Sequence, residues 1–181
     1  LLDKHMNTDS KLMDMLTGYA ASHQHPFNVF VHMIGIPTIM FGVLIPLTWL
    51  RFELPIGSFT LAHVLLVGFV IFYLSLDVVF ALAFAALGLV LVTLAVDVGQ
   101  LPLRLSGSIA LACFFGGYAL QFVGHAVEKS MPVLVKHPIQ AQLAAPFFTV
   151  VELFKILRLR EDLFDEVQRR IESAREGEAA A

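Results

Sequence analysis

Three histidines stand within ten residues at the beginning of the first long apolar segment: His23, His25 and His32. Imidazole is the commonest protein ligand of transition metals. Polar side chains placed where a helix enters lipid are costly and usually have a function. The stretch therefore predicts half of a metal site, and the other ligands must come from elsewhere in the chain.

The composition predicts an all-α integral membrane protein with the lipid bilayer as a partner. Of the 181 residues, 57% are hydrophobic and 15% are charged, and only five charged residues fall between Phe27 and Val127. The net charge of −3, without a basic stripe interleaved with aromatic residues, argues against a nucleic-acid partner. The single cysteine, Cys113, excludes a disulfide scaffold, and residues 1–5 are not followed by the apolar segment of a signal peptide.

Four membrane spans are predicted, at residues 26–50, 55–75, 78–96 and 105–127. The apolar stretch 54–96 would form a helix roughly 65 Å long, about twice the thickness of a bilayer, so it must fold back. Residues 75–77 offer the turn, with Asp77 as the cap of the next helix. Pro26 suits the first position of the first span.

Three further helices are expected to flank the spans. Residues 9–21 form a short amphipathic helix capped by Asp9 or Ser10. Residues 138–160 contain an apolar run too short to span, which is typical of an interfacial or re-entrant helix. Residues 161–176 form a polar, amphipathic C-terminal helix. The expected architecture is one membrane domain over residues 1–181, a bundle of four transmembrane helices with flanking helices.

An even number of spans puts both termini on one side, and this decides which histidines can meet. The side of the termini carries most of the lysines and arginines, whereas the opposite side carries only Arg51 and Arg104. We therefore expect both termini to be cytoplasmic. His125, at the end of the fourth span, and His137 after it then share one leaflet with the first cluster. His63 enters from the opposite side, roughly 15–20 Å away by helix rise. We expect it to bridge helices outside the site.

Helical spacing groups the candidates further. In a helix that begins after His25, the side chains of His25, Asn28 and His32 share one face. His125 and Glu128, three residues apart, also share a face. His23 precedes the helix and can fold back toward it, so the choice between His23 and His25 is open. The candidate ligands are His23, His25, His32, His125, Glu128 and His137.

Two blocks of the chain resemble the fungal 2-hydroxy-palmitic acid dioxygenase (Mpo) family of small membrane proteins. The first block, residues 19–41, carries His23, Pro26, Asn28, Val29, His32, Pro37 and Thr38. The second carries Gln121 to His125, Glu128-Lys129, Pro132, Ala145 to Phe148 and Glu152 to Lys155. The family pattern has adjacent histidines where this chain has His23-Gln24-His25, and one more residue between its Gly-His and Glu-Lys pairs. His23, His32 and His125 carry over directly.

The resemblance implies an Fe(II)-dependent dioxygenase of the endoplasmic reticulum that uses O₂ to shorten 2-hydroxy fatty acids by one carbon, a step of fatty acid α-oxidation. Nitrogen-rich ligation with open positions suits ferrous iron that must bind substrate and O₂. The expected ligands are His23, His32 and His125, with His137 or Glu128 completing or supporting the site. Asn28 and Tyr19 are expected to support the ligands.

Two other classes of protein remain as alternatives. Two histidines on facing helices can also ligate a b-type haem. A non-catalytic lipid-binding or scaffold protein could hold histidines that only satisfy one another. The host membrane stays open between a bacterial inner membrane and the endoplasmic reticulum, and so does the oligomeric state.

Overall fold

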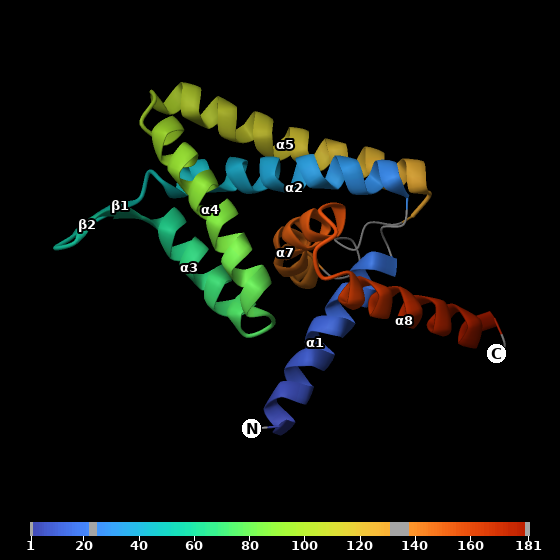
Figure 1. Cartoon of the computed structure of the whole chain (residues 1–181). Helices are drawn as coiled ribbons and strands as arrows, with labels where there is room; N and C mark the ends of the chain where they lie inside the picture. The colour runs from blue at the N-terminus through green and yellow to red at the C-terminus, as the bar shows by residue number, and fades with distance from the viewer. Residues whose placement is uncertain (1, 22–24, 131–137, 180–181) are drawn as a thin grey trace.

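The computed structural model describes residues 2–21, 25–130 and 138–179, and these residues form seven helices and one two-stranded sheet (Figure 1). In chain order the elements are α1 (Leu2–Ala21), α2 (Pro26–Leu47), β1 (Arg51–Leu54), β2 (Gly57–Thr60), α3 (Leu61–Leu74), α4 (Val78–Gly99), α5 (Leu103–Glu128), α7 (Pro138–Ile156) and α8 (Glu161–Ala179). The protein is mostly helical, as predicted, and the small sheet is an addition to that prediction.

Helices α2 and α5 run antiparallel, side by side along most of their lengths (Figure 1). Glycines allow this close approach. A Cβ atom at Gly117 would lie 2.8 Å from the carbonyl oxygen of Gly35, and one at Gly42 would lie 2.7 Å from the backbone nitrogen of Phe114. Because backbone atoms cannot move aside cheaply, any larger residue at these positions would force the two helices apart. The pairing brings the start of α2 and the end of α5 together at one end of the molecule.

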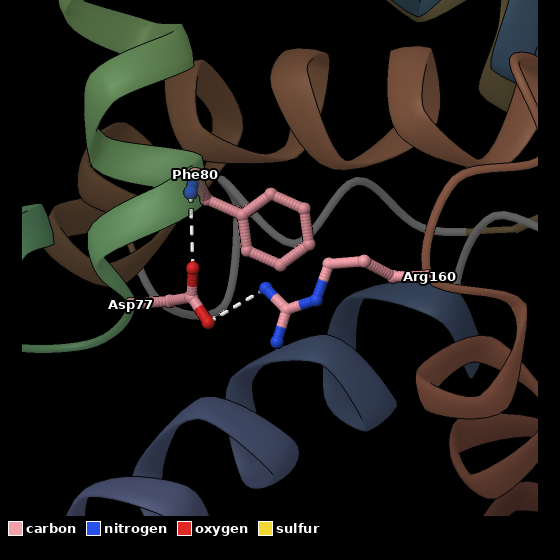
Figure 2. Close-up of polar contacts among 3 residues, drawn as sticks. All are labelled: Asp77, Phe80 and Arg160. Carbon is pink, nitrogen blue, oxygen red and sulfur yellow. Dashed lines mark hydrogen bonds and ion pairs between the residues drawn. The ribbon is translucent and has the colours of Figure 1, made fainter.

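The predicted turn between α3 and α4 is confirmed. Asp77 is the N-cap of α4, where its Oδ1 accepts a hydrogen bond from the backbone N–H of Phe80 at 3.0 Å. Its other oxygen, Oδ2, lies 2.7 Å from Nη1 of Arg160, the residue before α8. The Arg160 guanidinium also lies over the Phe80 ring, 4.7 Å from its centroid (Figure 2). One carboxylate therefore caps a helix and ties the α3–α4 turn to the C-terminal helices.

The predicted second span, residues 55–75, is wrong in its first part. Strands β1 and β2 pair antiparallel there, across a turn in which Gly57 has a φ of +141°, a conformation that residues with a Cβ rarely adopt. Thr60 then caps α3, together with the side chain of His63. With 14 residues, α3 is about 21 Å long, shorter than the hydrocarbon core of a bilayer. Of the described helices, α2, α4 and α5 are long and apolar enough to cross a membrane.

Other boundaries differ by shorter stretches. Helix α1 begins at Leu2 rather than at residue 9, since no glycine or proline interrupts residues 2–8. Helix α2 ends at Leu47 rather than at residue 50, just before the first strand. Helix α7 ends at Ile156 rather than at residue 160, because Arg158 and Arg160 adopt left-handed φ angles of 54° and 60°. Helices α4 and α5 exceed the predicted spans by a few residues at their ends.

Helix α7 occupies the space between the α2–α5 pair and the α3–α4 turn (Figure 1). The large apolar side chains of this region form a core to which α1, α3, α4, α7 and α8 all contribute. Its fully buried large members include Leu16, Tyr73, Phe80, Phe84 and Phe147. This packing holds one face of α7 against α2, close to the histidines.

Candidate metal site

The start of α2 is built around His25, Pro26 and Asn28. Pro26 occupies the first helical turn as predicted, and His25 is the N-cap, with its Nδ1 accepting a hydrogen bond from the backbone N–H of Phe27 at 3.2 Å. The His25 side chain is exposed, whereas Asn28 is fully buried. The imidazole of His25 therefore caps α2. The prediction from helical spacing, that His25 shares a face with Asn28 and His32, did not include this role.

Glu128, the last residue of α5, joins that end of α2. Its Oε1 accepts a hydrogen bond from the backbone N–H of His25 at 2.9 Å, and its Oε2 accepts one from Nδ2 of Asn28. A negative charge at a helix N-terminus is favoured by the helix dipole. After Glu128 the chain turns sharply, because Lys129 adopts a left-handed φ of 56°. The carboxylate thus fixes the relative position of the two helix ends.

His32 and His125 come together across this interface. Their ring centroids are 4.9 Å apart and the ring planes are nearly perpendicular, at 89°. Each side chain is 4% exposed. The prediction that these two histidines from different spans lie at the same depth therefore agrees with their observed contact.

The Nδ1 atoms of both histidines are held by hydrogen bonds. Nδ1 of His32 lies 2.9 Å from the backbone oxygen of Asn28, one turn earlier. A carbonyl oxygen can only accept, so His32 carries its proton on Nδ1 and, as a neutral imidazole, has its lone pair on Nε2. Nε2 is therefore the atom that a metal would bind.

Ser130 holds the Nδ1 proton of His125 in the same way, and the sequence analysis did not predict this residue. Its Oγ lies 2.9 Å from Nδ1 of His125 and donates to Oε2 of Glu128 at 3.4 Å. Because the hydroxyl proton points to the carboxylate, Oγ accepts the Nδ1 proton of His125. This chain from imidazole through hydroxyl to carboxylate orients a histidine as the outer shell of a metal site does. The available signal was a serine two residues after an acidic residue, which is too common to single out.

Tyr19 and Glu152 lie next to His32. A cavity of about 10 Å³ is lined by side chains of α1, α2 and α7, among them Tyr19, His32, Phe148 and Glu152. The Tyr19 ring packs on Phe148 with centroids 3.5 Å apart. Burial raises the pKa of the Glu152 carboxyl, and Lys155, 3.6 Å away, partly opposes that shift. Burial, with a smaller contribution from Glu152, also raises the pKa of Tyr19. An acidic residue inside the apolar run of α7 was the sequence signal for Glu152.

The remaining predicted residues do not join this group. His63 lies at the N-terminus of α3, where its Nδ1 accepts from the Thr60 backbone N–H at 3.2 Å. It caps its own helix rather than bridging two helices, and it lies outside the site as expected. His23 and His137 fall outside the described residues. Within residues 2–21, 25–130 and 138–179, no group of three or more histidine, cysteine or acidic side chains is arranged to hold a metal ion.

These features define a mostly helical protein with three described helices long and apolar enough to cross a membrane, and with a buried pair of oriented histidines where α2 begins and α5 ends. The model of the family described as 2-hydroxy-palmitic acid dioxygenase Mpo1-like matches residues 10–157. The chain belongs to this family, which confirms the resemblance noted in the sequence.

A curated relative from Saccharomyces cerevisiae supports the same assignment. It is named 2-hydroxy-palmitic acid dioxygenase MPO1 and is 35% identical over 147 residues, which cover 80% of this chain and 81% of the relative. No solved structure matches the chain. Both the family description and the name of the relative refer to a dioxygenase, which supports an enzyme that acts in lipid metabolism.

Proposed function

We propose that this chain is an iron-dependent dioxygenase that shortens 2-hydroxy fatty acids by one carbon. The observation that carries the proposal is the buried contact of His32 with His125, each with its Nδ1 proton committed to a hydrogen bond. Two neutral imidazoles that present Nε2 form a nitrogen-rich donor set, which suits ferrous iron with open positions. The substrate class follows the printed names of the family and of the yeast relative.

The proposed reaction balances with O₂ alone. A 2-hydroxy acid and one O₂ molecule give the acid one carbon shorter, carbon dioxide and water, as the C1–C2 bond breaks. All the oxidising equivalents come from O₂, so no separate reductant is required. A bound ferrous ion would supply the activation of O₂, a capacity that protein side chains lack.

The residues of the chain have three tasks in this proposal. The Asn28 carbonyl and the Ser130 hydroxyl keep the protons of the two imidazoles on Nδ1. Glu128 holds the end of α5 against the start of α2, which fixes the spacing of the histidines. The packed rings of Tyr19 and Phe148 exclude water beside His32.

We place the site at the cytoplasmic leaflet, with both termini on that side. The contact between His25 and Glu128 supports one part of this arrangement, because it brings the start of α2 and the end of α5 together, as an even number of membrane crossings requires. The opposite ends of these helices carry only Arg51 and Arg104, whereas more lysines and arginines flank the end with the histidines. An excess of lysine and arginine is typical of the cytoplasmic side.

The ring geometry argues against the haem alternative. A haem with two axial histidines needs its macrocycle between the imidazoles. The rings of His32 and His125 are in edge-to-face contact at 4.9 Å, which leaves no slot between them. A Soret band in the purified protein would overturn this conclusion.

The decisive experiment uses the full chain in lipid nanodiscs, loaded with Fe(II) without oxygen. Addition of O₂ and 2-hydroxyhexadecanoic acid should yield pentadecanoic acid, whereas hexadecanoic acid, which lacks the hydroxyl, should not react. His125→Ala should lower the activity more than about 100-fold, since loss of a residue that only hydrogen-bonds a metal ligand already lowers activity about 10–100-fold. His63→Ala should retain activity, because His63 only caps α3. A fully iron-loaded protein that makes no pentadecanoic acid would refute the proposal.

A further inference from the structure

An apolar cavity of about 230 Å³ lies between α2, α3, α4 and α7. Its walls include Met40 and Val43 of α2, Leu66 and Phe69 of α3, and Phe84 of α4. Of the described residues that line it, Gln142 of α7 is the one polar side chain, and its amide donates to the Tyr118 hydroxyl at 2.7 Å. Such a cavity suits a hydrocarbon and offers almost nothing to a polar ligand.

This cavity lies along the same two helices as the small cavity beside His32. On α2, Met33 and Ile36 line the small cavity, and Met40 and Val43 line the apolar one; these four residues share one helical face. Met40 is eight residues from His32, about 12 Å along the helix axis.

Helix α7 repeats this order. Thr149 lines the small cavity, and Pro146 and Gln142 line the apolar one, at spacings of three and seven residues. The small cavity beside His32 and the apolar cavity thus follow one another along α2 and α7.

Two features of these cavities suit a flexible chain. Met33 and Met40 are unbranched side chains that repack readily around a ligand. On α4, Gly88 leaves space that the Leu66 side chain of α3 partly fills, and a Cβ atom at Gly88 would meet Cδ1 of Leu66. The missing side chain therefore sets the width of the cavity.

We propose that this cavity binds the acyl chain of the 2-hydroxy fatty acid, with the hydroxyl and carboxyl groups directed along α2 toward His32 and His125. The inference rests on the proposed function for the identity of the substrate. It adds that α3 and α4, which contribute no candidate ligand among the described residues, determine chain-length preference.

The first test compares 2-hydroxy acids of different chain lengths. Val43→Phe narrows the far part of the cavity and should lower kcat/KM for 2-hydroxyhexadecanoic acid at least about tenfold, while 2-hydroxydecanoic acid stays within about twofold. The matched control, Val90→Phe, makes the same change at an exposed position of α4 and should alter neither value. An equal loss for both acids, or no loss for either, would overturn the inference.

The second test does not depend on turnover. Iron-free protein is illuminated with 2-hydroxyhexadecanoic acid that carries a diazirine near its methyl end, and the labelled residues are located by mass spectrometry. Label is expected on the cavity-lining residues of α3 or α4, reduced by Val43→Phe and by excess 2-hydroxyhexadecanoic acid. Label confined to exposed positions, or removed equally well by added phospholipid, would assign the cavity to membrane lipid and overturn the inference. The expected labelling of iron-free protein, together with no turnover after Fe(II) loading, would refute the proposed reaction and leave the binding site standing.

Discussion

The imidazole rings of His32 and His125 meet edge to face, 4.9 Å between centroids, although 93 residues separate them in the chain. The contact exists because glycines let α2 and α5 pack closely and because Glu128, at the end of α5, accepts a hydrogen bond from the start of α2. Both rings are oriented through Nδ1 by protein oxygens. The pair is therefore held in place by the protein itself.

Replacement of either histidine should abolish stoichiometric iron binding. His32→Ala and His125→Ala each remove one nitrogen donor, and we expect Fe(II) affinity to fall more than about 100-fold. Metal analysis after anaerobic loading and gel filtration measures the effect. His63→Ala is the control and should keep the iron content of the parent protein. Iron retained by both site variants would show that the metal binds elsewhere, or that the histidines only satisfy one another.

Loss of the Ser130 hydroxyl should weaken metal binding without unfolding the protein. Ser130→Ala removes the acceptor of the His125 Nδ1 proton, and outer-shell losses of this kind cost about 10–100-fold in metal affinity. Ser130→Thr keeps a hydroxyl and should recover most of the loss. Ser108→Ala, at an exposed serine of α5 that bonds Arg104, should have no effect on an Fe(II) titration. Equal affinities for the Ser130→Ala and parent proteins would remove Ser130 from the site.

Two adjacent glycines of α5 should respond differently to alanine. A Cβ atom at Gly117 would press on Ile39 and on the Gly35 backbone, whereas one at Gly116 meets nothing within 4 Å. We expect Gly117→Ala to destabilise the protein by about 1–3 kcal/mol, since it forces α2 and α5 apart. Gly116→Ala should be neutral or stabilising by up to about 1 kcal/mol, because alanine is the better helix former. Denaturation in mixed micelles measures both, and similar values would contradict the close packing.

The Asp77 carboxylate should contribute more to stability than its ion-pair partner Arg160. Asp77→Ala removes the N-cap of α4, at a cost of about 0.5–2 kcal/mol, as well as the ion pair. Arg160→Ala removes only a partly exposed ion pair and the contact with Phe80, together expected to be worth about 1 kcal/mol. Asp77→Asn keeps a cap acceptor and leaves Arg160 over the Phe80 ring, so it should cost no more than Arg160→Ala. A double-mutant cycle measures the coupling, and additive effects would show that the pair contributes nothing (Figure 2).

Glu152 should make the protein less stable as the pH rises. Its carboxyl, on α7 outside the three candidate spans, has a pKa raised by burial above the ordinary value of 4.5. Above pH 4.5 the unfolded chain loses this proton before the folded protein does, so the free energy of unfolding falls until the pH exceeds the folded pKa. Glu152→Gln should remove this decline, and its thermal midpoint should match that of the parent near pH 4 and exceed it at pH 8. The exposed control Glu172→Gln should follow the parent, and parallel curves for all three proteins would contradict a buried carboxyl.

The sequence alone determined the helical membrane class, the family and several local features of the site. Pro26 at the start of α2 and Asp77 as the cap of α4 were predictable, because caps and proline positions depend on a few neighbouring residues. The pairing of His32 with His125 followed from topology, since two spans that end at one surface bring their terminal residues to the same depth. Family resemblance and apolar periodicity are properties of the linear chain, so they needed no coordinates.

Only the tertiary structure decided how these residues are held and what surrounds them. The turn at Gly57 replaced the first part of a predicted span with a hairpin, because an apolar composition does not distinguish a short strand from a helix. Three contacts arise from side-chain packing: the hydrogen-bond chain through Ser130, the hydrogen bond of Glu128 with Asn28, and the position of Glu152 beside His32. Glu128 and Asn28 are 100 residues apart, and no local pattern encodes which rotamers meet at that separation. The sequence thus predicted that the ends of α2 and α5 lie together, and helix packing decided which of their residues touch.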